Sequence, residues 1–194
     1  MKRICVFAGS SPGVRPAYAA AARELGAAIA GRGIGLVYGG ASVGLMGELA
    51  NSALTGGAEV TGVIPRPLAN RELAHTGLTK IHVVESMHER KALMASLVDG
   101  FIALPGGYGT LEETFEVLTW SQLGIHRKPV GLLNVEGYYD RLIRFLEDSV
   151  REGLVKKEYF DLLLFAPRPG ELLDAFAEWR PPRLSGPWLD DSQL

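Results

Sequence analysis

Short apolar segments alternate with helical patterns along almost the whole chain, and this alternation restricts the fold more than any other feature. The apolar segments are continuous runs, such as "RICVFAG" (3–9) and "GLVYGG" (35–40), rather than alternations of apolar and polar residues. Continuous runs are typical of parallel strands covered on both faces, and parallel strands need crossover connections that are usually helical. The sequence therefore predicts an α/β fold: a Rossmann-like, doubly wound parallel sheet with helices on both faces.

The expected elements belong to one domain over residues 1–180. Strands are expected over residues 3–9, 35–40, 58–65, 80–86, 100–107, 128–134 and 162–166. Helices are expected over residues 15–33, 43–57, 87–98, 110–124, 138–153 and 169–179, and residues 66–78 should form a loop or a short irregular helix. The tail, residues 181–194, is rich in proline and is predicted to be poorly ordered.

Composition excludes several classes of function. The formal net charge of −2 provides no basic field for nucleic acid, and no apolar run approaches the roughly 18 residues of a membrane span. Cys5 is the only cysteine, so no internal disulfide can form and a reducing compartment is favoured. The four histidines lack metal-ligand spacing. We expect a cytoplasmic protein that needs no metal and binds neither nucleic acid nor a membrane.

Four strand ends carry residues suited to ligand binding, and parallel strands place these ends at one edge of the sheet. They are "AGSSPG" (8–13), "YGGASVGLMG" (38–47), "ESMHERK" (85–91) and "PGGYGT" (105–110). Glycine allows backbone N–H groups to approach a ligand closely, and the helix N-termini that follow favour an anion. We expect a phosphorylated ligand, with Gly9, Ser10 and Gly40 as candidate phosphate or ribose contacts. The motifs of P-loop NTPases and standard NAD sites are absent.

The segment "LPGGYGTLEE" (104–113) carries the densest set of constraints. Thr110 and Glu113 fit the S/T-x-x-E capping box, so one interpretation is that Glu113 only ties back to the helix start. However, Glu112 and Glu113 would point roughly 100° apart on a helix, so one cap does not explain both. The other interpretation is that a carboxylate faces sugar hydroxyls, or a carbon that develops positive charge.

The segment "MHERK" (87–91) contributes positive charge at the same edge. Arg90 and Lys91 fall near the predicted start of a helix, where the helix dipole disfavours cations. They either belong to a solvated surface turn or are held at the sheet edge to meet an anion or a leaving group.

Together, "PGGYGTLEE" and "MHERK" resemble the signature of the LOG (Lonely Guy) family. The pattern P-G-G-x-G-T-x-x-E is matched in full by residues 105–113, and M-x-x-R-K by residues 87–91. The resemblance extends over residues 3–165 and includes "CVFAGSSPG", "GLVYGGASVGLMG" and "TWSQLGIHRKPVGLLNVEGYYD". The third glycine of the frequent G-G-G-x-x-G-L-M-G form is Ala41 here, a departure that we do not expect to remove activity.

LOG proteins are cytokinin riboside 5′-monophosphate phosphoribohydrolases, often labelled lysine decarboxylases. The resemblance implies hydrolysis of the N-glycosidic bond of purine (cytokinin) riboside 5′-monophosphates or AMP, without a cofactor, by a homodimer or larger assembly. It makes Arg90 and Glu113 the essential pair and Gly106–Thr110 the phosphate loop. The implied substrate-binding residues are Glu72 (aligned by spacing only), Met87, Arg90, Lys91, Gly106, Gly107, Tyr108, Gly109, Thr110, Leu111, Glu112 and Thr119.

Two other functions are alternatives for this sequence. A non-catalytic nucleotide-binding or carrier module would share the fold, but it would not need both Arg90 and Glu113. A decarboxylase would need a Schiff-base lysine for pyridoxal phosphate, and only Lys91 lies near the inferred site. The sequence leaves open the choice between AMP and a cytokinin nucleotide, and the individual roles of Arg90 and Glu113.

Overall fold

The structure, a computed structural model, describes residues 1–69, 74–182 and 184. Seven parallel strands form one sheet: β1 (Arg3–Phe7), β2 (Gly35–Tyr38), β3 (Val60–Pro65), β4 (Lys80–Val84), β5 (Phe101–Ala103), β6 (Val130–Leu133) and β7 (Leu163–Ala166). The helices are α1 (Pro16–Gly31), α2 (Gly44–Thr55), α3 (Arg66–Leu68), α4 (Met87–Ser96), α5 (Tyr108–Leu123), α6 (Asp140–Arg151), α7 (Lys157–Phe160) and α8 (Pro169–Glu178), with a 3-10 turn, η2, at Val135–Gly137. The predicted fold class is confirmed.

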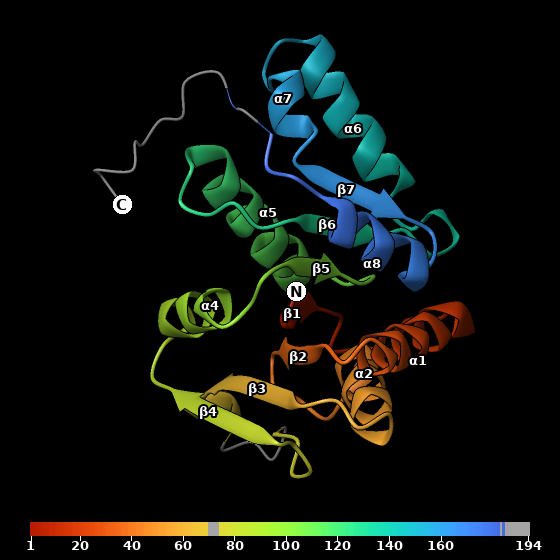
Figure 1. Cartoon of the computed structure of the whole chain (residues 1–194), viewed down its shortest axis with the longest axis vertical. Helices are drawn as coiled ribbons and strands as arrows, with labels where there is room; N and C mark the ends of the chain where they lie inside the picture. Colours follow the sequence, from red (N-terminus) through yellow and green to blue (C-terminus); the bar gives the residue numbers. More distant parts are fainter. Residues whose placement is uncertain (70–73, 183, 185–194) are drawn as a thin grey trace.

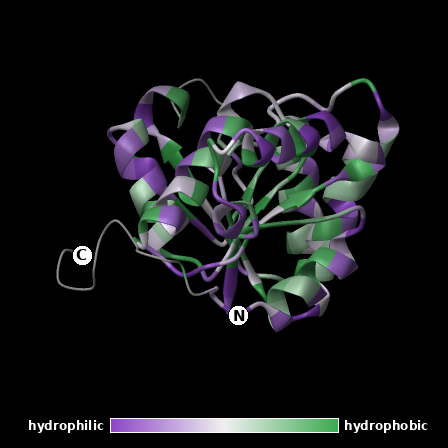
Figure 2. Cartoon of the chain, turned by 90° about the horizontal axis from the view of Figure 1, so that it is seen from above, coloured by the Kyte–Doolittle hydropathy of each residue, from purple (hydrophilic) through white to green (hydrophobic). Residues whose placement is uncertain are grey.

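Helices lie on both faces of the sheet, and its central strands are largely apolar (Figures 1 and 2). The first core cluster packs α1, α2 and α8 against one face, and the second packs α4, α5 and α6 against the other. Successive strand residues contribute to opposite clusters: Val6 lies in the first and Phe7 in the second. Burial on both faces explains why the central strands are continuous apolar runs, whereas the edge strand β4 is mostly exposed.

The strand order, β4-β3-β2-β1-β5-β6-β7, reverses direction between β1 and β5. The chain adds β2, β3 and β4 on one side of β1, then returns to pair β5 with its other side. At such a switch point the loops after the two neighbouring strands diverge to opposite faces and leave a crevice at the carboxyl ends of the strands. Here these loops are residues 8–15 and 104–107.

Two predicted helix starts are wrong. The helix expected from residue 110 begins at Tyr108, because Gly107 takes the extended N-cap conformation and Gly109 is helical. The helix expected from residue 138 begins at Asp140, because η2 precedes it. The short helix α7 was not predicted, whereas α3 fits the short helix expected within residues 66–78. Most of the predicted tail lies outside the described residues.

Within the part of the chain that the structure describes, no helix combines the length and the apolar character that a membrane crossing requires.

Candidate active site

A cavity of about 260 Å³ opens at the carboxyl ends of the strands, where the strand order reverses. Its walls come from the ends of β1 and β2 and from the starts of α2, α4 and α5. The lining residues are Val6, Phe7, Ala8, Gly9, Ser10, Gly39, Met46, Met87, Arg90, Gly107, Tyr108, Gly109, Thr110, Glu112 and Glu113. Segments up to 107 positions apart in the sequence, Val6 and Glu113 at the extremes, thus share one small site.

The N-terminus of α5 presents backbone donors to this cavity. Gly107 is the N-cap, and the N–H of Leu111 donates to the carbonyl of Gly107 (3.1 Å). The N–H groups before Leu111 therefore have no carbonyl partner within the helix. Since the helix dipole also favours negative charge here, this end of the cavity can bind an anion such as a phosphate.

The capping-box interpretation of Thr110 and Glu113 is wrong. Among the described residues no side chain caps the start of α5, and Glu113 lies six positions beyond its N-cap. A cap of this S-x-x-E kind forms at the start of α4 instead. The Ser86 hydroxyl accepts a hydrogen bond from the N–H of Glu89 (3.1 Å), and the Glu89 carboxylate accepts one from the N–H of Glu85 (2.8 Å). The two α5 glutamates consequently lie one turn deeper than the sequence suggested, away from the anion-binding amides.

Glu113 and Arg90 form a buried ion pair at the cavity wall. The guanidinium Nη2 lies 3.3 Å from Glu113 Oε1, and the two side chains are 12% and 10% exposed. This carboxylate oxygen is buried and, apart from the ion pair, has no hydrogen-bond partner among the described residues. Burial raises the pKa of Glu113 above its usual range, and the charge of Arg90 opposes that rise. A desolvated, incompletely satisfied carboxylate in a cavity is a candidate for acid–base or electrostatic catalysis.

Arg90 is held from two further directions. Its Nε donates to the carbonyl of Val63 in β3 (3.1 Å), and Nη1 lies 3.8 Å from the sulfur of Met87. Gly39, at the end of β2, leaves room for the guanidinium: a Cβ there would lie 2.4 Å from Nη2 of Arg90 and 3.1 Å from the sulfur of Met46. β3, α4 and the glycine that follows β2 therefore define the position of one cation.

Gly39→Ala should lower turnover by at least about tenfold while changing the melting temperature little. The added methyl meets only the flexible ends of two side chains, so the fold can accommodate it, but Arg90 must move away from Glu113. The check is kcat for nucleotide hydrolysis together with a thermal melt. Gly31→Ala is the matched control, because a Cβ at Gly31 meets nothing within 4 Å. Unchanged kcat in Gly39→Ala would contradict this role.

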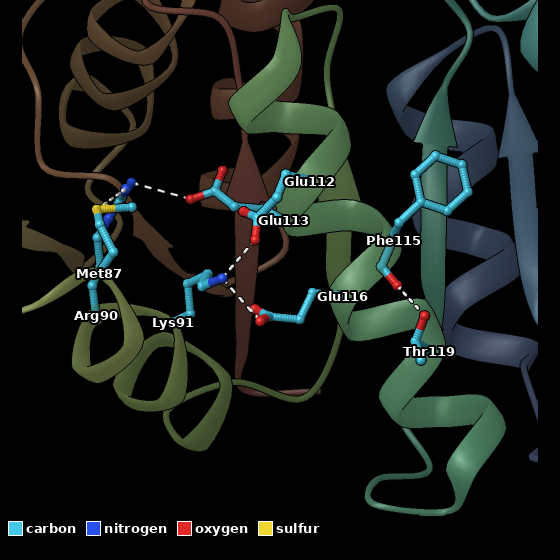
Figure 3. A network of polar contacts seen from close by, with 8 residues as sticks. All are labelled: Met87, Arg90, Lys91, Glu112, Glu113, Phe115, Glu116 and Thr119. Carbon is cyan, nitrogen blue, oxygen red and sulfur yellow. Dashed lines mark hydrogen bonds and ion pairs between the residues drawn. The ribbon is translucent and has the colours of Figure 1, made fainter.

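Lys91 belongs to a second charged group beside the cavity. Its Nζ donates to Glu112 (2.6 Å) and Glu116 (2.9 Å), and its side chain is buried. The hydrogen bond to Glu112, assisted by Glu116 and opposed by desolvation, raises the pKa of Lys91. Figure 3 shows these α4 cations facing the α5 carboxylates. Lys91 therefore orients Glu112, which lines the cavity, while Lys91 itself does not.

The structure brings together most of the predicted site residues. Gly9, Ser10, Met87, Arg90, Gly107, Tyr108, Gly109, Thr110, Glu112 and Glu113 line the cavity. Gly106, Gly40, Leu111 and Thr119 do not, and Glu72 lies outside the described residues. Gly106 sits behind the wall, where a Cβ would lie 2.1 Å from the Thr110 hydroxyl. Thr119 bonds to the carbonyl of Phe115 further along α5, away from the cluster (Figure 3).

Sequence reasoning missed Gly39 and Met46 as parts of the cavity wall. Both fall within "YGGASVGLMG", which was recognised as glycine-rich, but nothing local to that segment identifies which glycine faces Arg90. Among the described residues there is also no group of three or more His, Cys, Asp or Glu side chains arranged to hold a metal ion.

Known proteins resemble this chain over most of its length. A family model described as "Possible lysine decarboxylase" matches residues 46–176. The cytokinin riboside 5′-monophosphate phosphoribohydrolase LOG7 of Arabidopsis thaliana is 52% identical over 180 residues, which cover 93% of this chain and 83% of the relative. The chain belongs to the LOG family. The phosphoribohydrolase LOG of Oryza sativa subsp. japonica is 48% identical over 190 residues, or 98% of this chain and 78% of that one.

Solved structures share the LOG-family fold at lower identity. The molybdenum cofactor carrier protein MCP of Chlamydomonas reinhardtii superposes with a TM-score of 0.68 at 24% identity, over 91% of this chain and 96% of the other. This likeness supports the architecture alone.

Proposed function

We propose that this LOG-family protein hydrolyses the N-glycosidic bond of a purine riboside 5′-monophosphate, releasing the free base and ribose 5-phosphate. The observation that carries the proposal is the buried Glu113 carboxylate, paired with Arg90 in the wall of a cavity that also has a helix N-terminus. The α5 amides suit the 5′-phosphate, and the carboxylate one turn further suits the sugar. The names of relatives about 50% identical support the same activity.

The charges fit the expected transition state. As the bond from C1′ to the base nitrogen breaks, C1′ develops oxocarbenium character, which a nearby carboxylate stabilises. Water supplies the new C1′–O bond and gives up a proton, and the departing base gains one. A carboxylate with a raised pKa is suited to accept the proton of the water. The position of Arg90, 3.3 Å from Glu113, favours a role in orienting and ionising that carboxylate.

The two alternatives have less support. Lys91 does not suit a Schiff base, because its ammonium is paired with two carboxylates and its pKa is raised, which disfavours the neutral amine. A non-catalytic carrier rests only on a shared fold at 24% identity. A carrier also gives no reason to keep a desolvated Glu113 beside Arg90.

The deciding experiment measures base release by chromatography. Purified protein is incubated with AMP and, separately, with isopentenyladenosine 5′-monophosphate, with the corresponding nucleosides as controls. We expect release of base and ribose 5-phosphate from at least one nucleotide and much slower release from the nucleosides, which lack the phosphate. Binding of both nucleotides without release of base would overturn the proposal and support the carrier.

We further propose a cytoplasmic homodimer or larger assembly. Phe115, Thr119 and Leu123 form an i, i+4, i+8 row on α5, and the two apolar residues belong to neither core cluster although both are half-buried. Covering this row with a second copy would bury it. Light scattering at micromolar concentration should give at least twice the 20.9 kDa chain mass, and a monomer would contradict the proposal.

Cys5, buried and unpaired, fits a reducing compartment.

A further inference from the structure

The connection from β6 to α6 is bonded to the loop that follows β5. The hydroxyl of Tyr138 donates to the carbonyl of Gly106 (2.6 Å), and the hydroxyl of Tyr139 donates to the carbonyl of Leu104 (2.7 Å). Two adjacent tyrosines thus bind two carbonyls on the stretch that leads into α5. Tyr139 is fully buried, whereas Tyr138 is 40% exposed and lies at the surface end of the loop.

The bond to Gly106 fixes a peptide plane at the cavity wall. In a planar trans peptide, the C=O of one residue and the N–H of the next point in opposite directions. Holding the carbonyl of Gly106 toward Tyr138 therefore directs the N–H of Gly107 away from Tyr138. Gly107 lines the cavity and is the N-cap of α5, where an anion would bind.

This peptide plane needs an external restraint. Both of its residues are glycines, whose backbones have the widest conformational freedom, and the carbonyl of Gly106 precedes the helix. Without a partner the plane could rotate and withdraw one donor from the anion. A restraint made before the ligand arrives lowers the entropy cost of binding.

Tyr138 is itself held rigidly. Its ring meets Tyr18 edge-on (centroids 5.4 Å apart) and Tyr139 edge-on (4.8 Å). The turn before it contains Glu136 with a φ of 47°, a left-handed conformation that is costly for a glutamate, and Glu136 pairs with Arg15 (3.6 Å). The structure thus maintains a strained turn that places this hydroxyl against the loop.

We propose that Tyr138 is a positioning residue that orients the anion-binding amides at the start of α5, and so determines affinity for the 5′-phosphate. The inference rests on the proposed function, because it assigns the phosphate to those amides. It concerns the phosphate end of the substrate only, and therefore separates Tyr138 from Glu113 and Arg90 at the sugar end.

The test compares Tyr138→Phe with Tyr18→Phe. The first variant keeps the ring and removes the hydroxyl from Gly106. The control removes a hydroxyl from the ring packed against Tyr138, for which the structure shows no hydrogen bond to the described residues.

Calorimetry measures binding of AMP, ribose 5-phosphate and adenosine, and kinetics measures KM and kcat. We expect Tyr138→Phe to weaken binding of both phosphates about threefold to tenfold, with a matching rise in KM. Adenosine affinity, kcat and the melting temperature should stay near wild type, and Tyr18→Phe should match wild type throughout.

Each outcome bears on a defined claim. Unchanged phosphate affinity in Tyr138→Phe would overturn the inference, and so would an equal loss for AMP and adenosine. If the wild type binds AMP but releases no base, the proposed reaction fails while the binding series still tests Tyr138. If the wild type binds neither AMP nor ribose 5-phosphate, both proposals fail.

Discussion

Glu113→Gln should lower turnover at least about 100-fold while the protein stays folded and binds AMP with near-normal affinity. Glutamine keeps the size and polarity of the side chain but removes the negative charge beside the reacting carbon. The phosphate should still bind, because the proposed donors are backbone amides one turn away. The measurements are kcat for base release, AMP affinity by calorimetry, and a thermal melt.

The pH profile of the wild type provides an independent check. Burial raises the pKa of Glu113, and the reaction needs the carboxylate form. Activity should therefore fall as pH decreases through this raised pKa, at a higher pH than for an exposed glutamate, and Glu113→Gln should lose that acid limb. Glu48→Gln is the matched control, since Glu48 is half-exposed on α2 and pairs with Arg23 (2.8 Å). Near-normal turnover in a folded Glu113→Gln protein would refute the catalytic assignment.

The fold could be predicted because its signals are local. A continuous apolar run identifies a strand covered on both faces, and the central strands appear where such runs occur, whereas the edge strand β4 (KIHVV) is mostly exposed. The strand order could not be predicted in this way, because pairing β5 with β1 joins residues almost 100 positions apart and leaves no local pattern. That pairing creates the switch point and hence the cavity.

The site was predictable in its residue types and less so in its geometry. Arg90 and Glu113 meet as expected, since both follow strand ends at one edge of the sheet. The predicted start of α5 is wrong because a glycine N-cap in extended conformation has no side chain that identifies it, whereas Thr110 fits the sequence pattern of an N-cap residue. The sequence places Tyr138 in a helix, whereas a 3-10 turn with a left-handed Glu136 precedes α6. That turn depends on contacts across the fold and leaves no local pattern.

Arg90→Ala should also lower turnover at least about 100-fold, and it should shift the acid limb of any residual activity to higher pH. The charge of Arg90 lowers the pKa of Glu113, so its removal raises that pKa further and leaves less carboxylate at neutral pH. An acid limb that stayed in place in Arg90→Ala would contradict the effect of Arg90 on the ionisation of Glu113.

The double variant Arg90→Ala/Glu113→Gln decides whether the two residues act as a unit. Each single change already disables the pair, so the double variant should be little slower than either single one. Arg23→Ala, Glu48→Gln and their double variant form the matched control cycle, because that exposed pair has similar charges and lies on α1 and α2. The control cycle should leave turnover unchanged, as expected for a surface ion pair. If the losses from Arg90→Ala and Glu113→Gln multiply instead, the two side chains stabilise separate parts of the transition state, and Arg90 then acts on the leaving base rather than through Glu113.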